Sequence, residues 1–82
     1  MSYEKVLQAS NLIVGTKQTV RALKSGHVKE VFVALDADPR ITDNIIFIAN
    51  EMDVPIIKVD SMKKLGKACG IDVRATTVAI IQ

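Results

Sequence analysis

The stretch at residues 11–26 constrains the fold most, because it predicts a short strand that turns on a glycine directly into a helix. Residues 12–14 are apolar and typical of a buried strand, and Gly15 provides the pivot. We expect Thr16 to cap the helix and Gly26 to end it. A helix that begins in this way leaves unpaired backbone N–H groups at its positive end, so the sequence predicts an anion site there.

The first turns of this helix carry cationic and amide side chains. Lys17 and Gln18 lie in the first turn, and Arg21 lies one turn further along. Lys17, Arg21 and Lys24 follow an i, i+4, i+7 spacing, which predicts one basic stripe on the helix surface. Helix starts normally favour acidic residues, so this first turn runs against the electrostatic preference and indicates a functional role.

The whole chain alternates between strand patterns and helix patterns. We expect strands at residues 12–14, 29–35, 56–59 and 76–81, and helices at residues 3–9, 17–25, 39–52 and 62–68. The second strand is a nearly continuous apolar run, which is typical of a central strand covered on both faces. The short connections predict an α/β fold, a three-layer α-β-α sandwich with a four-stranded mixed sheet.

Two expected helices have recognisable starts. Ser2 would cap the first helix, whose Val6 and Leu7 would face inward. Asp38 would cap the third helix, with Pro39 at its first position.

Composition narrows the possible classes of protein. The 82 residues are 49% hydrophobic and 24% charged, which indicates one globular domain over residues 1–82. Aromatic residues are scarce, which disfavours a stacking platform for single-stranded nucleic acid. The single Cys69 excludes a disulfide framework, and no apolar run is long enough to span a membrane. We therefore expect a cytoplasmic monomer with no cofactor and no metal.

The distribution of charge along the chain indicates which surfaces could bind a partner. Basic residues outnumber acidic ones in residues 1–35 and 61–82, whereas acidic residues dominate residues 36–60. If the fold brings the two basic segments together, the molecule has a basic side and an acidic side. The alternative is that surface lysines only keep a small domain soluble.

Catalytic chemistry is poorly represented. His27 and Cys69 stand far apart without a motif around them. Asp36 and Asp38 could be paired catalytic or metal-binding carboxylates, but turn and capping roles explain them without further partners. The segment that begins at Gly15 resembles part of a phosphate loop but lacks its spacing. We therefore expect a protein that is not an enzyme.

The loop at residues 70–75 has a composition suited to binding. Ile71 and Val73 stand between glycine and charged residues, so they either tuck into the core or offer an apolar surface. A base splayed from an RNA bulge would suit such a surface, because its π-face favours apolar contact and its backbone favours Lys and Arg.

Three motifs, at residues 15–26, 28–39 and 65–75, are strongly similar to the kink-turn-binding ribosomal proteins. These are the archaeal L-seven-Ae group and its relatives in the ribosomal L-thirty-e superfamily, and the short bacterial YbxF type is the most similar. The resemblance runs from Val6 to Ile81. It implies an α-β-α sandwich that binds kink-turns, which are RNA helices sharply bent at a three-nucleotide bulge followed by tandem sheared G·A pairs.

The resemblance also implies roles for individual residues. Gly15 and Thr16 would insert at the bent major groove. The side chains expected to contact the G·A guanines and adjoining phosphates are Lys17, Gln18 and Arg21. Archaeal members carry Asn-Glu where this chain has Lys17-Gln18, so we expect kink-turn binding to be kept with altered affinity or site preference.

The final loop has an implied role too. The residues that would cover the flipped bulge nucleotides and help to hold the bend are Ile71, Asp72, Val73 and Arg74. Lys24 and Lys67 would be phosphate neighbours.

The preferred hypothesis is a protein that recognises and stabilises kink-turn RNA, with ribosomal RNA, riboswitches and other leader RNAs as candidate partners and the ribosome as a further one. The alternative is a protein–protein or ribosome-assembly module without direct base recognition. A small-molecule or nucleotide enzyme is the second alternative. Salt dependence separates the first two, because phosphate contacts make the affinity fall steeply with salt concentration.

Overall fold

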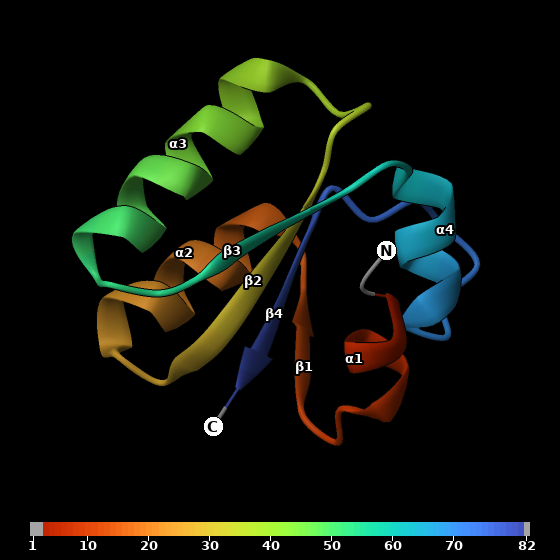
Figure 1. The fold of residues 1–82 in the computed structure, drawn as a ribbon, viewed down its shortest axis with the longest axis horizontal. Coiled ribbons are helices and arrows are strands. Elements are labelled where there is room, and N and C mark those ends of the chain that lie inside the picture. The colour runs from red at the N-terminus through yellow and green to blue at the C-terminus, as the bar shows by residue number, and fades with distance from the viewer. Residues whose placement is uncertain (1–2, 82) are drawn as a thin grey trace.

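Helices and strands alternate along the chain in a computed structural model that describes residues 3–81 (Figure 1). The helices are α1 (Tyr3–Gln8), α2 (Thr16–Ser25), α3 (Pro39–Glu51) and α4 (Met62–Ala68). The strands are β1 (Leu12–Val14), β2 (Val28–Ala34), β3 (Ile56–Val59) and β4 (Thr77–Ile81). Every predicted element is present within one or two residues at its ends. None of the helices within residues 3–81 is long and apolar enough to cross a membrane.

The sheet has the strand order β1-β4-β2-β3. β4 pairs antiparallel with both β1 and β2, whereas β2 pairs parallel with β3. In Figure 1, α2 and α3 cover one face of this sheet, and α1 and α4 cover the other. The predicted α-β-α sandwich with a mixed four-stranded sheet is therefore confirmed.

The core consists of one apolar cluster on each face of the sheet. Alternation along β2 sends Val31 and Val33 to the cluster beneath α2 and α3, and sends Phe32 to the cluster beneath α1 and α4. Leu23 and Ile45 complete the first cluster from their helices. The apolar run of β2 is thus covered on both faces, as its sequence pattern predicted.

The first helix differs from its prediction at one position. Val6 is buried and packs with Tyr3 on the core side, but Leu7 is 66% exposed. Successive helical residues are turned by about 100°, and Val6 is the buried residue of α1, so the side chain of Leu7 points away from the core contact that Val6 makes. The predicted cap at Ser2 lies outside the described residues.

The starts of α3 and α4 have side-chain caps. The carboxylate of Asp38 accepts a hydrogen bond of 2.9 Å from the backbone N–H of Arg40, which confirms the predicted cap. At α4, the hydroxyl of Ser61 accepts from the backbone N–H of Lys64 at 3.2 Å. A second carboxylate, that of Asp36, accepts from the first backbone N–H of α4 at 2.9 Å.

The start of α2 differs from the sequence prediction in the residue that caps it. Gly15, rather than Thr16, is the N-cap, and no side chain within residues 3–81 hydrogen-bonds to cap this helix. Gly15 has a φ of 114°, a conformation that side-chain-bearing residues rarely adopt. The turn is therefore completed at the glycine, and Thr16 already belongs to the helix.

One end of the sheet gathers three helix starts. Because β1, β2 and β3 each run directly into a helix, α2, α3 and α4 all begin toward the upper end of the sheet in Figure 1. The loop that leads into β4 arrives at the same end. The backbone N–H of Gly15 bonds the carbonyl of Thr77 at 2.9 Å, and that of Ala34 bonds the carbonyl of Thr76 at 3.0 Å. Ligand sites in α/β sheets form at such ends.

Candidate nucleic-acid interface

The start of α2 presents hydrogen-bond donors and no acidic side chain. Lys17, Gln18 and Arg21 are exposed and together line a small hollow of about 150 Å³. The first turn of α2 contains no acidic residue. The backbone N–H groups of this turn therefore point to the same region as a cation, an amide and a guanidinium. This group of three residues, called here the α2 cluster, can bind phosphates and the acceptor atoms of bases.

Lys24 does not line the hollow of the α2 cluster, although it lies one helical turn from Arg21. It belongs to the last turn of α2, about 10 Å along the helix axis from Lys17 at 1.5 Å per residue. The residues that follow Lys24 in the sequence end the helix, and among them the Ser25 hydroxyl lies 3.3 Å from His27 Nδ1. The basic stripe is therefore continuous along the helix, but only its first part stands at the end of the sheet.

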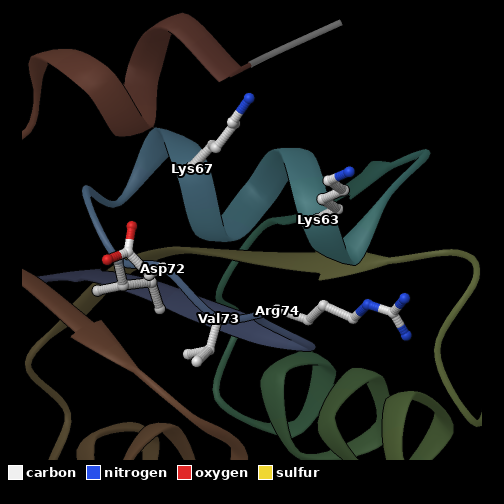
Figure 2. A pocket seen from close by; sticks show the side chains of 6 residues that line it. Lys63, Lys67, Asp72, Val73 and Arg74 are labelled. Carbon is white, nitrogen blue, oxygen red and sulfur yellow. The ribbon is translucent and has the colours of Figure 1, made fainter.

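A second group of side chains forms a pocket between α4 and the loop that follows it. The pocket has a volume of about 260 Å³. Its lining residues, called here the loop pocket, are Lys63, Lys67, Ile71, Asp72, Val73 and Arg74. Figure 2 shows the two lysines projecting from α4, with Asp72 and Arg74 leaving the loop on either side of Val73. Lys67 and the four predicted loop residues are thus brought together.

Lys63 is a lining residue that was expected on the outer side of α4 but was not among the residues predicted to contact RNA. It precedes Lys67 by four residues, so both point to the same side of α4. That i, i+4 spacing is visible in the sequence and could have identified it.

Backbone contacts fix the loop on α4. The N–H of Ile71 bonds the carbonyl of Gly66 at 3.1 Å, and the N–H of Ala75 bonds the carbonyl of Met62 at 3.0 Å. Ile71 is half-buried and packs against the core, whereas Val73 is 68% exposed. The loop residues therefore divide between the two roles left open by the sequence, because Ile71 tucks inward and Val73 offers an apolar surface.

The α2 cluster and the loop pocket lie on opposite faces of the sheet, and both lie near the same end of it. α2 covers one face and α4 the other. Gly15 is bonded to Thr77, the first residue of β4, and the loop leads directly into that residue. A ligand long enough to pass around this end can contact both groups.

The residues considered for catalysis have structural roles. Asp36 and Asp38 cap α4 and α3, and the guanidinium of Arg40 holds the pKa of Asp38 below its usual value. Burial raises the pKa of the Cys69 thiol, which disfavours the reactive thiolate. Within residues 3–81, no group of three or more His, Cys, Asp or Glu side chains is arranged to hold a metal ion.

Comparison with known proteins identifies the family. Residues 2–82 match the family model described as the ribosomal protein L7Ae/L30e/S12e/Gadd45 family. The chain belongs to this family. It is a family of non-enzymatic proteins, which confirms the expectation that the chain is not an enzyme.

Relatives of the same length carry RNA-binding names. An RNA-binding protein of Geobacillus sp. (strain WCH70) is 66% identical over 82 residues, covering all of both chains. The RNA-binding protein YbxF of Geobacillus stearothermophilus is 61% identical over the same span, again covering both chains completely.

Solved structures share the fold. The Giardia lamblia 15.5kD RNA binding protein superposes with a TM-score of 0.84 at 26% identity, covering 98% of this chain and 67% of that one. A Bacillus halodurans protein of unknown function gives a TM-score of 0.85 at 21% identity, covering 98% and 80% of the two chains, and supports the fold alone.

Proposed function

We propose that this protein binds RNA and that it recognises and stabilises kink-turns. The observation that carries the proposal is the placement of the α2 cluster and the loop pocket on either side of one end of the sheet, where the N–H of Gly15 bonds the first residue of β4. Membership of the L7Ae/L30e family and the RNA-binding names of full-length relatives support the RNA partner.

The α2 cluster is assigned to the tandem sheared G·A pairs. Lys17 donates to guanine O6 and N7 or to a neighbouring phosphate. The carbonyl oxygen of Gln18 accepts from guanine N1–H or N2–H. Arg21, one turn further along, reaches a base edge or the adjoining phosphate. Gly15 and Thr16 allow the backbone of the helix start to approach the RNA closely, because Gly15 carries no side chain.

The loop pocket is assigned to the unpaired bulge. Val73 gives apolar contact to a splayed base, and Lys67 and Arg74 neutralise phosphates beside it. Lys24 is assigned a phosphate further along the same RNA stem, in keeping with its position outside the hollow of the α2 cluster. Ribosomal RNA, riboswitches and other leader RNAs in the cytoplasm are the proposed sources of the kink-turn.

A gel shift on paired RNAs tests the proposal. One RNA carries the bulge and tandem G·A pairs, and its counterpart replaces both G·A pairs by Watson–Crick pairs. We expect strong binding to the first RNA only. Equal affinity for both would contradict kink-turn recognition, and an affinity independent of salt would favour the protein–protein or assembly module instead.

A charge-matched pair of variants locates the interface. Arg21→Ala should weaken binding by about 1–3 kcal/mol if Arg21 reads a base, and by less if it contacts only phosphate. Lys29→Ala removes the same charge from the first residues of β2, at the opposite end of the sheet. Lys29→Ala should leave the affinity unchanged apart from a small general electrostatic loss, and an equal loss in both variants would place the RNA elsewhere.

A further inference from the structure

The loop pocket contains one carboxylate among three cations. Asp72 shares the lining with Lys63, Lys67 and Arg74, and the apolar residue Val73 stands between Asp72 and Arg74 (Figure 2). A surface that bound only phosphate would gain nothing from a carboxylate at this position, because like charges repel. The pocket of about 260 Å³ lies below the usual range for drug-sized ligands, which is about 300–1,000 Å³, and suits a single nucleobase.

Asp72 is not neutralised by its neighbours. The ion pairs within residues 3–81 join Lys5 to Glu30, Arg40 to Asp38 and Lys64 to Asp60. Neither Asp72 nor the three cations of the pocket takes part in them. The carboxylate and the cations line the same pocket from different sides, and none of them is paired with another charge within residues 3–81, so their hydrogen-bonding capacity is available to a ligand.

Guanine is the base whose edges match this combination. Its Watson–Crick edge presents two adjacent donors, N1–H and N2–H, which a carboxylate can bind with both oxygens. Its other edge presents the acceptors O6 and N7, which lysine and arginine favour. Uracil offers a single N3–H donor, and adenine and cytosine each offer one amino group on that edge.

We propose that Asp72 makes the loop pocket selective for an unpaired guanine. The carboxylate accepts from N1–H and N2–H, and Lys63, Lys67 or Arg74 donates to O6 and N7. The side chain of Val73 contacts the face of the base. This inference rests on the proposed function and deepens it, because it names the base preferred at one position of the bulge.

A panel of RNAs tests the inference. All share the stems and G·A pairs of one kink-turn, with an all-uridine bulge as the reference and each bulge position changed in turn to guanosine, adenosine or cytidine. We expect one position at which guanosine lowers the Kd about tenfold relative to uridine. Inosine at that position lacks the N2 amino group and should give an intermediate Kd, and 7-deazaguanosine should reveal the share contributed through N7.

Asp72→Asn separates recognition from folding. It should abolish the guanosine preference while keeping or tightening binding to the all-uridine RNA, because it removes a negative charge beside phosphates. A merely structural role for Asp72 would instead weaken binding to every RNA. Glu51→Gln, which removes the same charge from the end of α3, should leave the preference intact.

Two outcomes would overturn the inference. These are equal Kd values for all four bases at every bulge position, or a guanosine preference that persists in Asp72→Asn. The all-uridine RNA and its counterpart without G·A pairs, measured in parallel, report on the proposed function independently. Kink-turn recognition can therefore hold while guanine selection fails.

Discussion

The backbone carbonyl of Val73 occupies the position that a side chain at Gly66 would need. A Cβ placed on Gly66 would lie 2.0 Å from that oxygen, well inside any real contact distance. The loop packs this closely on α4 because residue 66 is a glycine. The shape of the loop pocket therefore depends on a residue that does not line it.

Gly66→Ala should damage both stability and RNA binding. The added methyl group must displace backbone, so we expect a loss of about 1–3 kcal/mol in the free energy of unfolding, measured by urea denaturation, together with weaker kink-turn binding. Gly26→Ala is the control, because a Cβ there meets nothing within 4 Å but the φ of 80° is unfavourable. It should cost about 1–2 kcal/mol of stability and leave RNA affinity unchanged. Unchanged RNA affinity in Gly66→Ala would contradict a role for loop position.

Thr77→Val should be neutral or stabilising. The Thr77 hydroxyl is fully buried and has no hydrogen-bond partner within residues 3–81. Replacing it by a methyl group of similar shape removes the cost of burying an unpaired polar group, so stability should rise by up to about 1 kcal/mol. The control is Thr76→Val, which removes a hydroxyl that contacts Met62 Sδ at 3.6 Å. A destabilised Thr77→Val would show that the buried hydroxyl is hydrogen-bonded in solution.

Lys17→Glu should raise stability while lowering RNA affinity. An anion in the first turn interacts favourably with the positive helix end, which contributes about 0.3–1 kcal/mol. The same change removes a phosphate or guanine contact and adds repulsion, so we expect at least a tenfold loss in kink-turn affinity. Thermal unfolding and fluorescence anisotropy measure the two effects. Lys29→Glu, with the same charge change far from α2, should show neither, and parallel losses in both variants would indicate general electrostatics only.

The Tyr3–Asp60 hydrogen bond should make stability depend on acid pH. The Tyr3 hydroxyl donates to the Asp60 carboxylate at 2.5 Å, and this bond, followed by the contact with Lys64, lowers the pKa of Asp60. A lowered pKa in the folded state stabilises the fold above the unfolded value of about 3.9, and that contribution is lost as the pH falls through the folded value.

Tyr3→Phe tests this dependence. The variant should be less stable than the original chain at pH 7, and the difference should shrink as the pH falls below the unfolded value of about 3.9 and through the lowered pKa of Asp60 in the folded chain. A residual difference is expected at every pH, because the Tyr3 oxygen also accepts from the N–H of Ser61 at 3.2 Å. A stability difference that stays constant with pH would contradict the proposed linkage.

The alternation of elements could be predicted because each signal is local. The apolar run of β2 and the Asp38-Pro39 start of α3 depend on neighbouring residues alone, and both were confirmed. The end of α2 at Gly26 was also confirmed, because glycine permits the left-handed conformation with a φ of 80° that closes the helix. The prediction for Leu7 was wrong because the face of α1 that packs against the core, rather than apolar character, decides which of two successive residues is buried.

The site was only partly predictable, since contacts between distant residues decide it. Gly15 is the N-cap because its carbonyl accepts the first helical hydrogen bond, from the N–H of Thr19 at 3.1 Å, while its own N–H bonds Thr77 of the neighbouring strand. Thr19, a residue of α2, is fully buried, although its polar side chain does not predict this. The position of Lys24 outside the hollow of the α2 cluster likewise depends on the folded structure, whereas the i, i+4 spacing of Lys63 and Lys67 is visible in the sequence.

The layered arrangement has a consequence for the shape of the partner. The α2 cluster and the loop pocket are held on helices that cover opposite faces of one sheet, so the thickness of the sandwich sets their separation. A straight duplex is a rod and can lie along one face only. An RNA that touches both groups has to turn around the end of the sheet. Under the proposed function we therefore expect the fold to select RNA by curvature, because an RNA that bends too little or too much would lose one of the two sets of contacts.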